Sequence, residues 1–311
     1  MIDFCGLQLA HPIVNGSGTF DAIAARRAFG DALLAAFPFS AFVSKTITLH
    51  PRDGNPPPRL WETPAGMINS IGLPNRGLQG YLEHDLPQLA QLPVALITNV
   101  MGSTAQEVAL LVEAVGDRDE IAAIELNVSC PNVRTGLDIG ADPGSLAELM
   151  RAVRPLSAKP LIVKLTPSTA DVGAVAAAAE AEGADAVSLI NTLRATALHP
   201  AAVRRAPRRW LGGGAGGLSG PAIRAIALAQ VTAVAGKVTI PIVGMGGVGS
   251  GRHAQDLLSA GATLVAVGTE SFRDPAAGSR IAAELKSLQI ANVADMYEAQ
   301  VEVDLNSVDS A

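Results

Sequence analysis

Short apolar segments rich in β-branched residues alternate along the chain with longer segments of helical period. The apolar segments predict eight strands, at residues 12–18, 41–46, 93–100, 122–129, 160–166, 186–192, 241–247 and 264–270. The longer segments predict helices near 22–36, 77–91, 104–116, 144–157, 170–182, 220–236, 250–260 and 275–288. Several predicted helices begin at a capping residue, namely Ser103 or Thr104, Ser168 or Thr169, and Ser250.

This alternation predicts a parallel sheet that closes on itself. Strands that are apolar on both faces are typical of parallel sheets, which helices cover on both sides. Eight strand–helix units are the number that forms a (β/α)8 barrel, and such barrels often form one domain at this chain length. We therefore expect an α/β protein with a (β/α)8 TIM barrel, in a single domain over residues 1–311.

Composition narrows the class of protein. With 311 residues, 49% of them apolar and 17% charged, the chain can bury a large core. Only 4% of the residues are aromatic and the net charge is -6, which argues against nucleic acid as a partner. The sequence has no run of 18 apolar residues and no basic segment followed by an apolar one at its start, so we expect a cytoplasmic protein that neither spans a membrane nor is secreted.

Metal and disulfide sites are not indicated either. Cys5 and Cys130 are the two cysteines, too few for a disulfide framework or a site of four thiolates. The five histidines show no ligand spacing. We expect a protein without a metal.

Polar residues or glycines stand at the carboxyl end of nearly every predicted strand. They are Asn15 and Ser17, Ser44 and Lys45, Asn99, Asn127 and Cys130, Lys164 and Thr166, Asn191 and Thr192, Gly246 and Gly247, and Gly268 and Thr269. Active sites of (β/α)8 barrels lie at this face. Lys45 and Lys164 follow apolar strands, where a charge is costly unless it meets an anion. Any one of these residues could equally cap a strand or helix, but the set as a whole predicts a binding site.

The segment IELNVSCPNV, residues 124–133, has the most unusual strand end. Cys130 lies between Asn127 and Asn132, whose amides can donate to and accept from a planar polar ligand. Pro131 forces the chain out of the sheet. Cys130 is therefore a candidate acid or base, with a buried cysteine that serves only as a small apolar residue as the alternative.

Two glycine-rich segments match the G-x-G-x-x-G fingerprint. The first, GMGGVG at 244–249, lies in the seventh strand–helix unit, whereas the dinucleotide fingerprint belongs to the first unit of a doubly wound domain. The loops after strands seven and eight commonly hold a phosphate in barrels, so FMN fits better than a dinucleotide. The second, GGGAGG at 212–217, follows the basic segment RRAPRRW at 204–210 and no predicted strand. We interpret it as a flexible loop leading to the sixth helix, with Gly220 near the start of that helix.

The chain resembles the class 1 dihydroorotate dehydrogenases over nearly its whole length. The segments that carry the resemblance are residues 44–77, NVSCPNV at 127–133, KLTP at 164–167, SLINT at 188–192, GGLSGPAI at 216–223, PIVGMGGV at 241–248 and AVGTESF at 266–272. GNPPPR, GLSGPAI and GMGG make it most similar to the catalytic subunit of the NAD-linked subtype, class 1B. The loops VRTGLDIGADP after Asn132 and LRATAL after Thr192 depart from the usual wording of the family.

The resemblance implies oxidation of dihydroorotate to orotate in pyrimidine (UMP) biosynthesis, with FMN as the cofactor. It implies that Cys130 is the catalytic base. It implies that substrate binds to Lys45, Asn69, Ser70, Ile71, Gly72, Leu73, Asn127, Asn132, Asn191 and Thr192. For the flavin it implies Ser17, Lys45, Thr46, Asn99, Asn127, Lys164, Ile190, Gly220, Gly246, Gly247, Gly268 and Thr269.

The resemblance also implies partners. The NAD-linked subtype works with a subunit that carries FAD and an iron–sulfur cluster, so we expect such a partner and a homodimer or heterotetramer. The alternatives are a class 1 enzyme that uses fumarate or another acceptor without a partner, a related flavin barrel that reduces another pyrimidine, and a flavin-binding scaffold subunit inactive alone.

Overall fold

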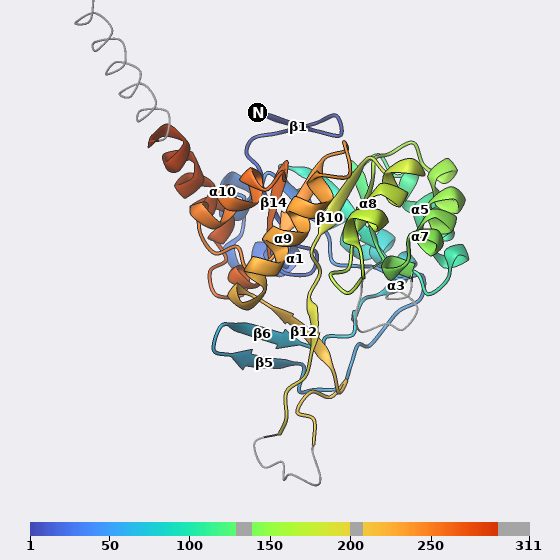
Figure 1. The fold of residues 1–311 in the computed structure, drawn as a ribbon, viewed down its shortest axis with the longest axis horizontal. Coiled ribbons are helices and arrows are strands. Elements are labelled where there is room, and N and C mark those ends of the chain that lie inside the picture. The colour runs from blue at the N-terminus through green and yellow to red at the C-terminus, as the bar shows by residue number, and fades with distance from the viewer. Residues whose placement is uncertain (129–138, 200–207, 292–311) are drawn as a thin grey trace, which may run out of the picture.

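The computed structural model describes residues 1–128, 139–199 and 208–291, and within these ranges eight parallel strands form one sheet (Figure 1). The strands are β3 (Ile13–Asn15), β4 (Ala41–Val43), β7 (Ala95–Val100), β8 (Ala123–Asn127), β9 (Leu161–Lys164), β10 (Ala186–Leu189), β13 (Ile242–Met245) and β14 (Leu264–Val267). Their hydrogen-bonded order is β3–β14–β13–β10–β9–β8–β7–β4. Each strand lies inside one of the eight predicted segments, so the predicted (β/α)8 barrel is confirmed. The prediction of a single domain over 1–311 stays a prediction.

A buried asparagine closes the barrel between its first two strands. β3 and β4 are the two ends of the strand order. The backbone N–H of Ser40 donates to the carbonyl of Ile13 at 3.0 Å. Asn15, which is fully buried, donates from Nδ2 to the carbonyl of Val43 at 2.8 Å and accepts from the N–H of Val43 at 2.8 Å. The side-chain amide thus takes the place of a peptide group, and the backbone groups of Val43 are satisfied without a continuous ladder.

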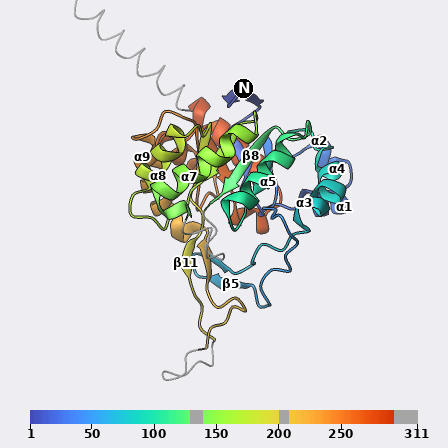
Figure 2. The ribbon, with the colours of Figure 1, turned by 90° about the vertical axis from the view of Figure 1, so that its right-hand side faces the viewer.

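Helices surround the barrel, as Figures 1 and 2 show. They are α1 (Ala22–Phe29), α2 (Ala32–Ala35), α3 (Gly77–Gly80), the π-helix η1 (Tyr81–Asp85), α4 (Leu86–Leu89), α5 (Ala105–Gly116), α7 (Pro143–Val153), η2 (Arg154–Leu156), α8 (Val172–Ala181), η3 (Pro221–Ile223), α9 (Arg224–Ala235), α10 (Gly251–Ser259), η4 (Thr269–Phe272) and a helix over residues 277–291.

The helix boundaries correct the sequence prediction in three places. The segment 22–36 is two helices, because Gly30 at its break has φ 61°, outside the helical range. The segment 77–91 contains a π-helical turn. Thr104 and Ser250 cap α5 and α10 as predicted. The cap of α8, however, is Asp171, which accepts from the N–H of Ala174, rather than Ser168 or Thr169.

Two apolar layers hold the barrel together. Inside it, small and branched side chains from all eight strands form one cluster: Val14, Ala41, Val43, Ile97, Ala123, Ile162, Ala186, Val243, Leu264 and Ala266. A hairpin of β1 (Ile2–Phe4) and β2 (Leu7–Leu9) adds the buried side chains of Phe4 and Leu9 to this cluster. Burial of each of these two side chains stabilises the fold by about 1.5–3 kcal/mol. The second, larger cluster fills the space between the strands and the helices.

A four-stranded antiparallel sheet lies beyond one end of the barrel, opposite the hairpin (Figure 1). Its strands are β5 (Leu60–Thr63), β6 (Gly66–Asn69), β11 (Leu193–Ala195) and β12 (Gly216–Ser219), in the order β11–β12–β6–β5. The sequence did not predict it. We call it the mouth sheet, because β5 and β6 follow β4, and β11 and β12 follow β10, at the carboxyl ends of these barrel strands.

The sequence suggested that the segment GGGAGG is a flexible loop, but the structure places its end in a strand. Its last two residues, Gly216 and Gly217, begin β12. A Cβ atom at Gly216 would lie 2.3 Å from the carbonyl oxygen of Asn69, and one at Gly217 would lie 1.9 Å from Oγ1 of Thr192. These glycines allow close packing of β12 against its neighbours rather than mobility. Gly220 does stand at the start of a helical segment, as predicted, with φ 87° at the cap of η3.

Across the described ranges, the structure contains no helix with both the length and the apolar character that crossing a bilayer requires.

Candidate active site

The interior of the barrel changes from apolar to polar along the strands. Ile97, Ala123, Ile162 and Ala186 face the interior cluster on β7, β8, β9 and β10. Because side chains alternate between the two faces of a strand, the interior positions two residues further on are Asn99, Glu125, Lys164 and Ser188. Asn127 follows on β8. All five are buried. The polar half lies toward the carboxyl ends of the strands, where barrels build their sites.

A buried carboxylate organises this polar half. Glu125, with 3% of its surface exposed, accepts hydrogen bonds from Asn99 Nδ2 and from Ser188 Oγ, the latter at 2.8 Å. Since Asn99 points its NH2 group at Glu125, its Oδ1 faces elsewhere, and this buried oxygen has no hydrogen-bond partner in the described structure. Asn99 is thereby oriented to accept a hydrogen bond from a ligand. Glu125 was not among the site residues predicted from the sequence. The signal was a carboxylate inside the apolar run AAIEL, where a strand covered on both faces has no place for an unpaired charge.

Two lysines supply positive charge at the strand ends. Lys164, at the end of β9, is 6% exposed, and its partners in strand register are Asn127 and Ser188. Lys45, just after β4, reaches solvent, and the pKa of its ammonium is lowered from 10.5 by burial, which Asp21 opposes. Within the described ranges neither lysine has an ion-pair partner within 4.0 Å. Both are therefore suited to meet an anion, as the sequence predicted.

The loops after β3 and β4 join the end of β8 through hydroxyl groups. Ser17 Oγ donates to the carbonyl of Ser44 at 2.8 Å and lies 3.4 Å from Thr46 Oγ1. Asn127 Nδ2 donates to the same Thr46 oxygen at 3.2 Å. The structure thus brings together Ser17, Thr46 and Asn127, three residues that the family resemblance assigned to the flavin.

The loops after β13 and β14 are built for close approach to a ligand. Gly246 and Gly247 have φ values of 137° and 68°. A Cβ at Gly246 would lie 2.6 Å from Ala227 Cβ, and one at Gly247 would lie 2.7 Å from Arg224 Cβ, so only glycine fits. The backbone N–H groups of Gly246, Gly247, Gly268 and Thr269 have no acceptor in the part of the chain that the structure describes. Unpaired N–H groups gathered in glycine loops form a site for an anion such as phosphate.

The end of β12 joins these two loops. Thr269 Oγ1 donates to Ser219 Oγ at 2.9 Å. A Cβ at Gly220 would lie 3.6 Å from Thr269 Cγ2, and one at Gly247 would lie 3.0 Å from the carbonyl oxygen of Gly220. Ile190 donates its N–H to the carbonyl of Met245 at 3.0 Å, directly before Gly246. Ile190, Gly220, Gly246, Gly247 and Thr269 therefore lie together.

The predicted substrate residues 69–73 lie on the mouth sheet and the turn that follows it. Asn69 Nδ2 donates to the carbonyl of Gly217 at 3.2 Å, and Ser70 Oγ donates to that of Ala215 at 2.8 Å. The turn then passes through Ile71, Gly72 and Leu73, the last two with φ values of 76° and 55°. Leu73 in the left-handed region is uncommon for a branched side chain, and its carbonyl accepts from Asn75 Nδ2 at 2.9 Å.

Thr192 connects this sheet to the barrel. Its side chain occupies the space beside Gly217, and its N–H donates to Asn191 Oδ1 at 2.7 Å. Asn191 and Thr192 thus connect the end of β10 to the mouth sheet, with Thr192 beside β12. The remaining predicted residues, Cys130 and Asn132, lie outside the described residues.

Sequence comparison with known proteins identifies the family of this chain. The family model described as dihydroorotate dehydrogenase matches residues 1–288. The catalytic subunit of dihydroorotate dehydrogenase B (NAD(+)) from Citrifermentans bemidjiense is 43% identical over 282 residues, which cover 90% of each chain. The same subunit from Geobacter metallireducens is 40% identical over 303 residues, covering 96% of this chain and 95% of that one. A putative dihydroorotate dehydrogenase A (fumarate) from Solibacter usitatus is 43% identical over 285 residues, covering 90% of each chain. The chain belongs to the dihydroorotate dehydrogenase family.

Proposed function

We propose that this chain oxidises dihydroorotate to orotate in de novo pyrimidine (UMP) biosynthesis, with FMN as its cofactor. The observation that carries the proposal is the polar half of the barrel at the carboxyl ends of its strands, beside two glycine loops with unpaired N–H groups, in a member of this family. A flat ring with an anionic tail needs a deep polar surface for the ring and backbone donors for the phosphate. The barrel mouth offers both.

The residues fit FMN in three respects. The N–H groups of Gly246, Gly247, Gly268 and Thr269 can donate to the phosphate. The orphaned Oδ1 of Asn99 is a buried acceptor for a ring N–H, and the charge of Lys164 favours an electron-rich ring. Ser17, Lys45, Thr46, Asn127, Ile190 and Gly220 complete the set that we assign to the cofactor.

The substrate residues suit a flat carboxylate. We assign the substrate carboxylate to Lys45, because its ammonium has no ion-pair partner within the described ranges and a bound anion would oppose the lowering of its pKa by burial. The amides of Asn69, Asn127, Asn132 and Asn191 match the donors and acceptors on the ring edge. The backbone of residues 70–73 and the hydroxyl of Thr192 complete the set.

Cys130 is the base of this proposal. Oxidation removes a proton from the ring carbon beside a carbonyl and a hydride from the neighbouring carbon. FMN, when bound, supplies the acceptor for that hydride. A thiol has an ordinary pKa of about 8.5, so its thiolate is a usable base near neutral pH. In this proposal the thiolate of Cys130 takes the proton.

Replacement of Cys130 tests the function. Cys130→Ser removes the thiolate and is expected to slow the bleaching of the flavin by dihydroorotate about 100-fold or more at neutral pH, while FMN remains bound. Cys5→Ser is the matched control, because Cys5 is the other cysteine and its thiol donates to the carbonyl of Asp185 at 3.3 Å, in the loop before β10. Unchanged bleaching in Cys130→Ser would remove Cys130 as the base, and no bleaching in the native protein would refute the function.

For the electron acceptor we propose NAD, reached through a second subunit. Relatives named as catalytic subunits of an NAD-linked enzyme support this, since a catalytic subunit implies another subunit. We propose that the partner carries FAD and an iron–sulfur cluster, that the barrels assemble as a homodimer or heterotetramer, and that the protein acts in the cytoplasm.

A second acceptor has support as well. The relative from Solibacter usitatus, named as a putative fumarate-linked enzyme, is as similar in identity as the NAD-linked ones. Reoxidation of the reduced protein by fumarate, measured without any partner, would favour this alternative. Reoxidation by NAD only when the partner is added would favour the proposal.

A further inference from the structure

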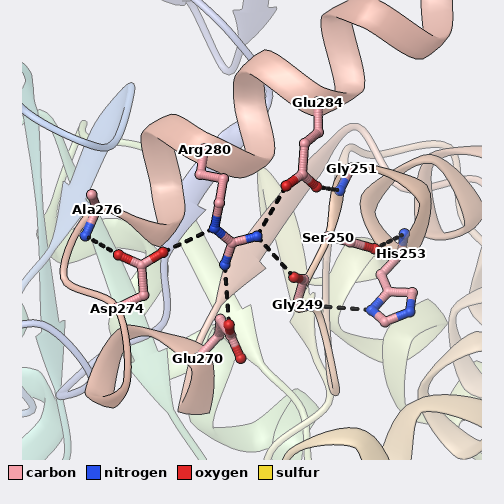
Figure 3. Close-up of polar contacts among 9 residues, drawn as sticks. All are labelled: Gly249, Ser250, Gly251, His253, Glu270, Asp274, Ala276, Arg280 and Glu284. Atoms are coloured by element: carbon pink, nitrogen blue, oxygen red, sulfur yellow. Dashed lines mark hydrogen bonds and ion pairs between the residues drawn. The ribbon is translucent and has the colours of Figure 1, made fainter.

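A guanidinium at the outer side of the barrel mouth ties the two proposed phosphate loops together (Figure 3). Arg280, on the helix over residues 277–291, donates to the carbonyl of Gly249 in the loop after β13 at 3.2 Å. It also donates to Glu270 in η4, directly after β14, at 3.0 Å. Two further bonds go to Asp274 at 2.9 Å and Glu284 at 3.1 Å. One side chain thus bridges the loops that carry Gly246, Gly247, Gly268 and Thr269.

Arg280 and the side chains near it bond to the backbone of the loop after β13. Glu284 accepts the N–H of Gly251 at 2.6 Å, and this bond, together with Arg280, lowers the pKa of its carboxyl. The N–H of Gly249 donates to His253 Nδ1 at 3.2 Å, as Figure 3 shows. A Cβ at Gly249 would lie 3.5 Å from Glu270 Oε2. The polar backbone of residues 249–251 is therefore fastened by side chains, whereas the N–H groups of Gly246 and Gly247 remain unpaired.

Charge gives Arg280 a second effect on the same loops. Glu270, Asp274 and Glu284 place three carboxylates around one cation. Without the guanidinium, these carboxylates would repel one another and any phosphate bound nearby. A lysine would keep the charge, but its single ammonium cannot reproduce the fork that reaches both loops.

We propose that Arg280 is a positioning residue that sets the two glycine loops at the spacing a phosphate group needs, and so gives the site its preference for FMN over riboflavin. The inference rests on the proposed function, because it takes the anion at these loops to be the phosphate of FMN. Arg280 touches neither ring nor substrate in this proposal. Its effect is on the phosphate alone.

The test compares two flavins that differ only in the phosphate. Flavin-free full-length protein is titrated with FMN and with riboflavin, and binding is followed by flavin fluorescence. Arg280→Gln is expected to weaken FMN about tenfold or more while riboflavin changes less than about twofold. Arg280→Lys is expected to lie between, and it also serves if the glutamine variant fails to fold.

Arg154→Gln is the matched control. Arg154 likewise bonds a carboxylate, that of Asp185 at 2.7 Å, and backbone carbonyls such as that of Lys159 at 3.0 Å, but it joins the loops before β9 and β10, at the other end of the strands. Its replacement is expected to lower stability and leave the ratio of the two affinities unchanged.

Failure of the role of Arg280 and failure of the proposed function give different results. An equal loss of FMN and riboflavin in both Arg280 variants, or an unchanged preference for FMN, would overturn the role of Arg280. A native protein that binds FMN and riboflavin equally would instead refute the phosphate site of the proposed function.

Discussion

Glu125 places a carboxylate inside the barrel, where its two oxygens accept from Asn99 and Ser188. Glu125→Ala would leave both buried donors unpaired, and we expect it to lower the free energy of unfolding by about 2–5 kcal/mol. Urea unfolding of the flavin-free protein measures this. Glu148→Ala removes an exposed carboxylate on α7 and is expected to change stability by less than about 0.5 kcal/mol. Similar values for the two variants would contradict the structural role of Glu125.

His11 makes stability depend on pH. Its Nδ1 accepts from the N–H of Ile13 at 3.3 Å, and burial lowers the pKa of its imidazole from 6.5. A lowered pKa means that the folded state favours the neutral ring. The stability it contributes is therefore present above pH 6.5 and is lost as the pH falls through the folded-state pKa.

We expect His11→Asn to reduce this loss, because an asparagine oxygen can accept from the same N–H two residues on and does not titrate. The measurement is the slope of the unfolding free energy against pH below 6.5. His84→Asn, at a side chain that is 56% exposed, is the control against which the change in His11→Asn is judged. An unchanged slope in His11→Asn would show that other groups cause it.

Sequence alone predicts the residues whose position follows from strand periodicity. Asn99 and Lys164 lie on the interior face because each stands two residues beyond an interior apolar residue. Asn127 lies there because it stands two residues beyond Glu125. Arg280 could not be found this way. Its partners Glu270 and Asp274 lie on a 3-10 helix and a turn, and only the spacing of four residues to Glu284 is visible in sequence.

At the scale of elements, Gly217 tests whether the mouth sheet must pack tightly on Thr192. Gly217→Ala would place a methyl group 1.9 Å from Thr192 Oγ1, so β12 must shift. We expect the free energy of unfolding to fall by about 1–3 kcal/mol and the affinity for orotate to fall at least about tenfold. Orotate is titrated into the flavin-loaded protein and followed by the flavin absorbance.

Gly236→Ala is the control for Gly217→Ala. Gly236 ends α9 with φ -79°, and the nearest atoms to an added Cβ are 3.8 Å away. The Gly236→Ala variant should bind orotate with the affinity of the native protein. Native affinity in Gly217→Ala would mean that the contact with Thr192 does not shape the substrate site.

The same sheet shows where element prediction ends. The eight barrel strands consist mostly of apolar residues and could be found from their composition. β12 consists of GGLS, which has low intrinsic strand preference, and it is a strand only because β6 and β11 pair with it. The partner of Gly217 in β6 is Asn69, 148 residues earlier, a distance that local patterns do not report.

At the scale of the whole molecule, the composition of the chain limits where the electrons can go. With two cysteines the chain cannot supply the four thiolates of an iron–sulfur cluster, and its fingerprint-like glycines at 244–249 belong to the barrel mouth. We expect the isolated, FMN-loaded chain to reduce a dye such as dichlorophenolindophenol with dihydroorotate but not NAD. Absorbance of NADH is the measurement. Reduction of NAD by the pure chain would contradict the need for a partner.

The pairing of Asn69 with Gly217 also sets an order of assembly. A chain that is still being synthesised has made the proposed substrate residues 69–73 long before β12 exists. These residues cannot take their final position until the later strand arrives, since contacts between distant parts of a chain form after the local ones. We therefore expect the proposed substrate site to be among the last parts of the molecule to form, and a chain that ends before β12 to bind no substrate.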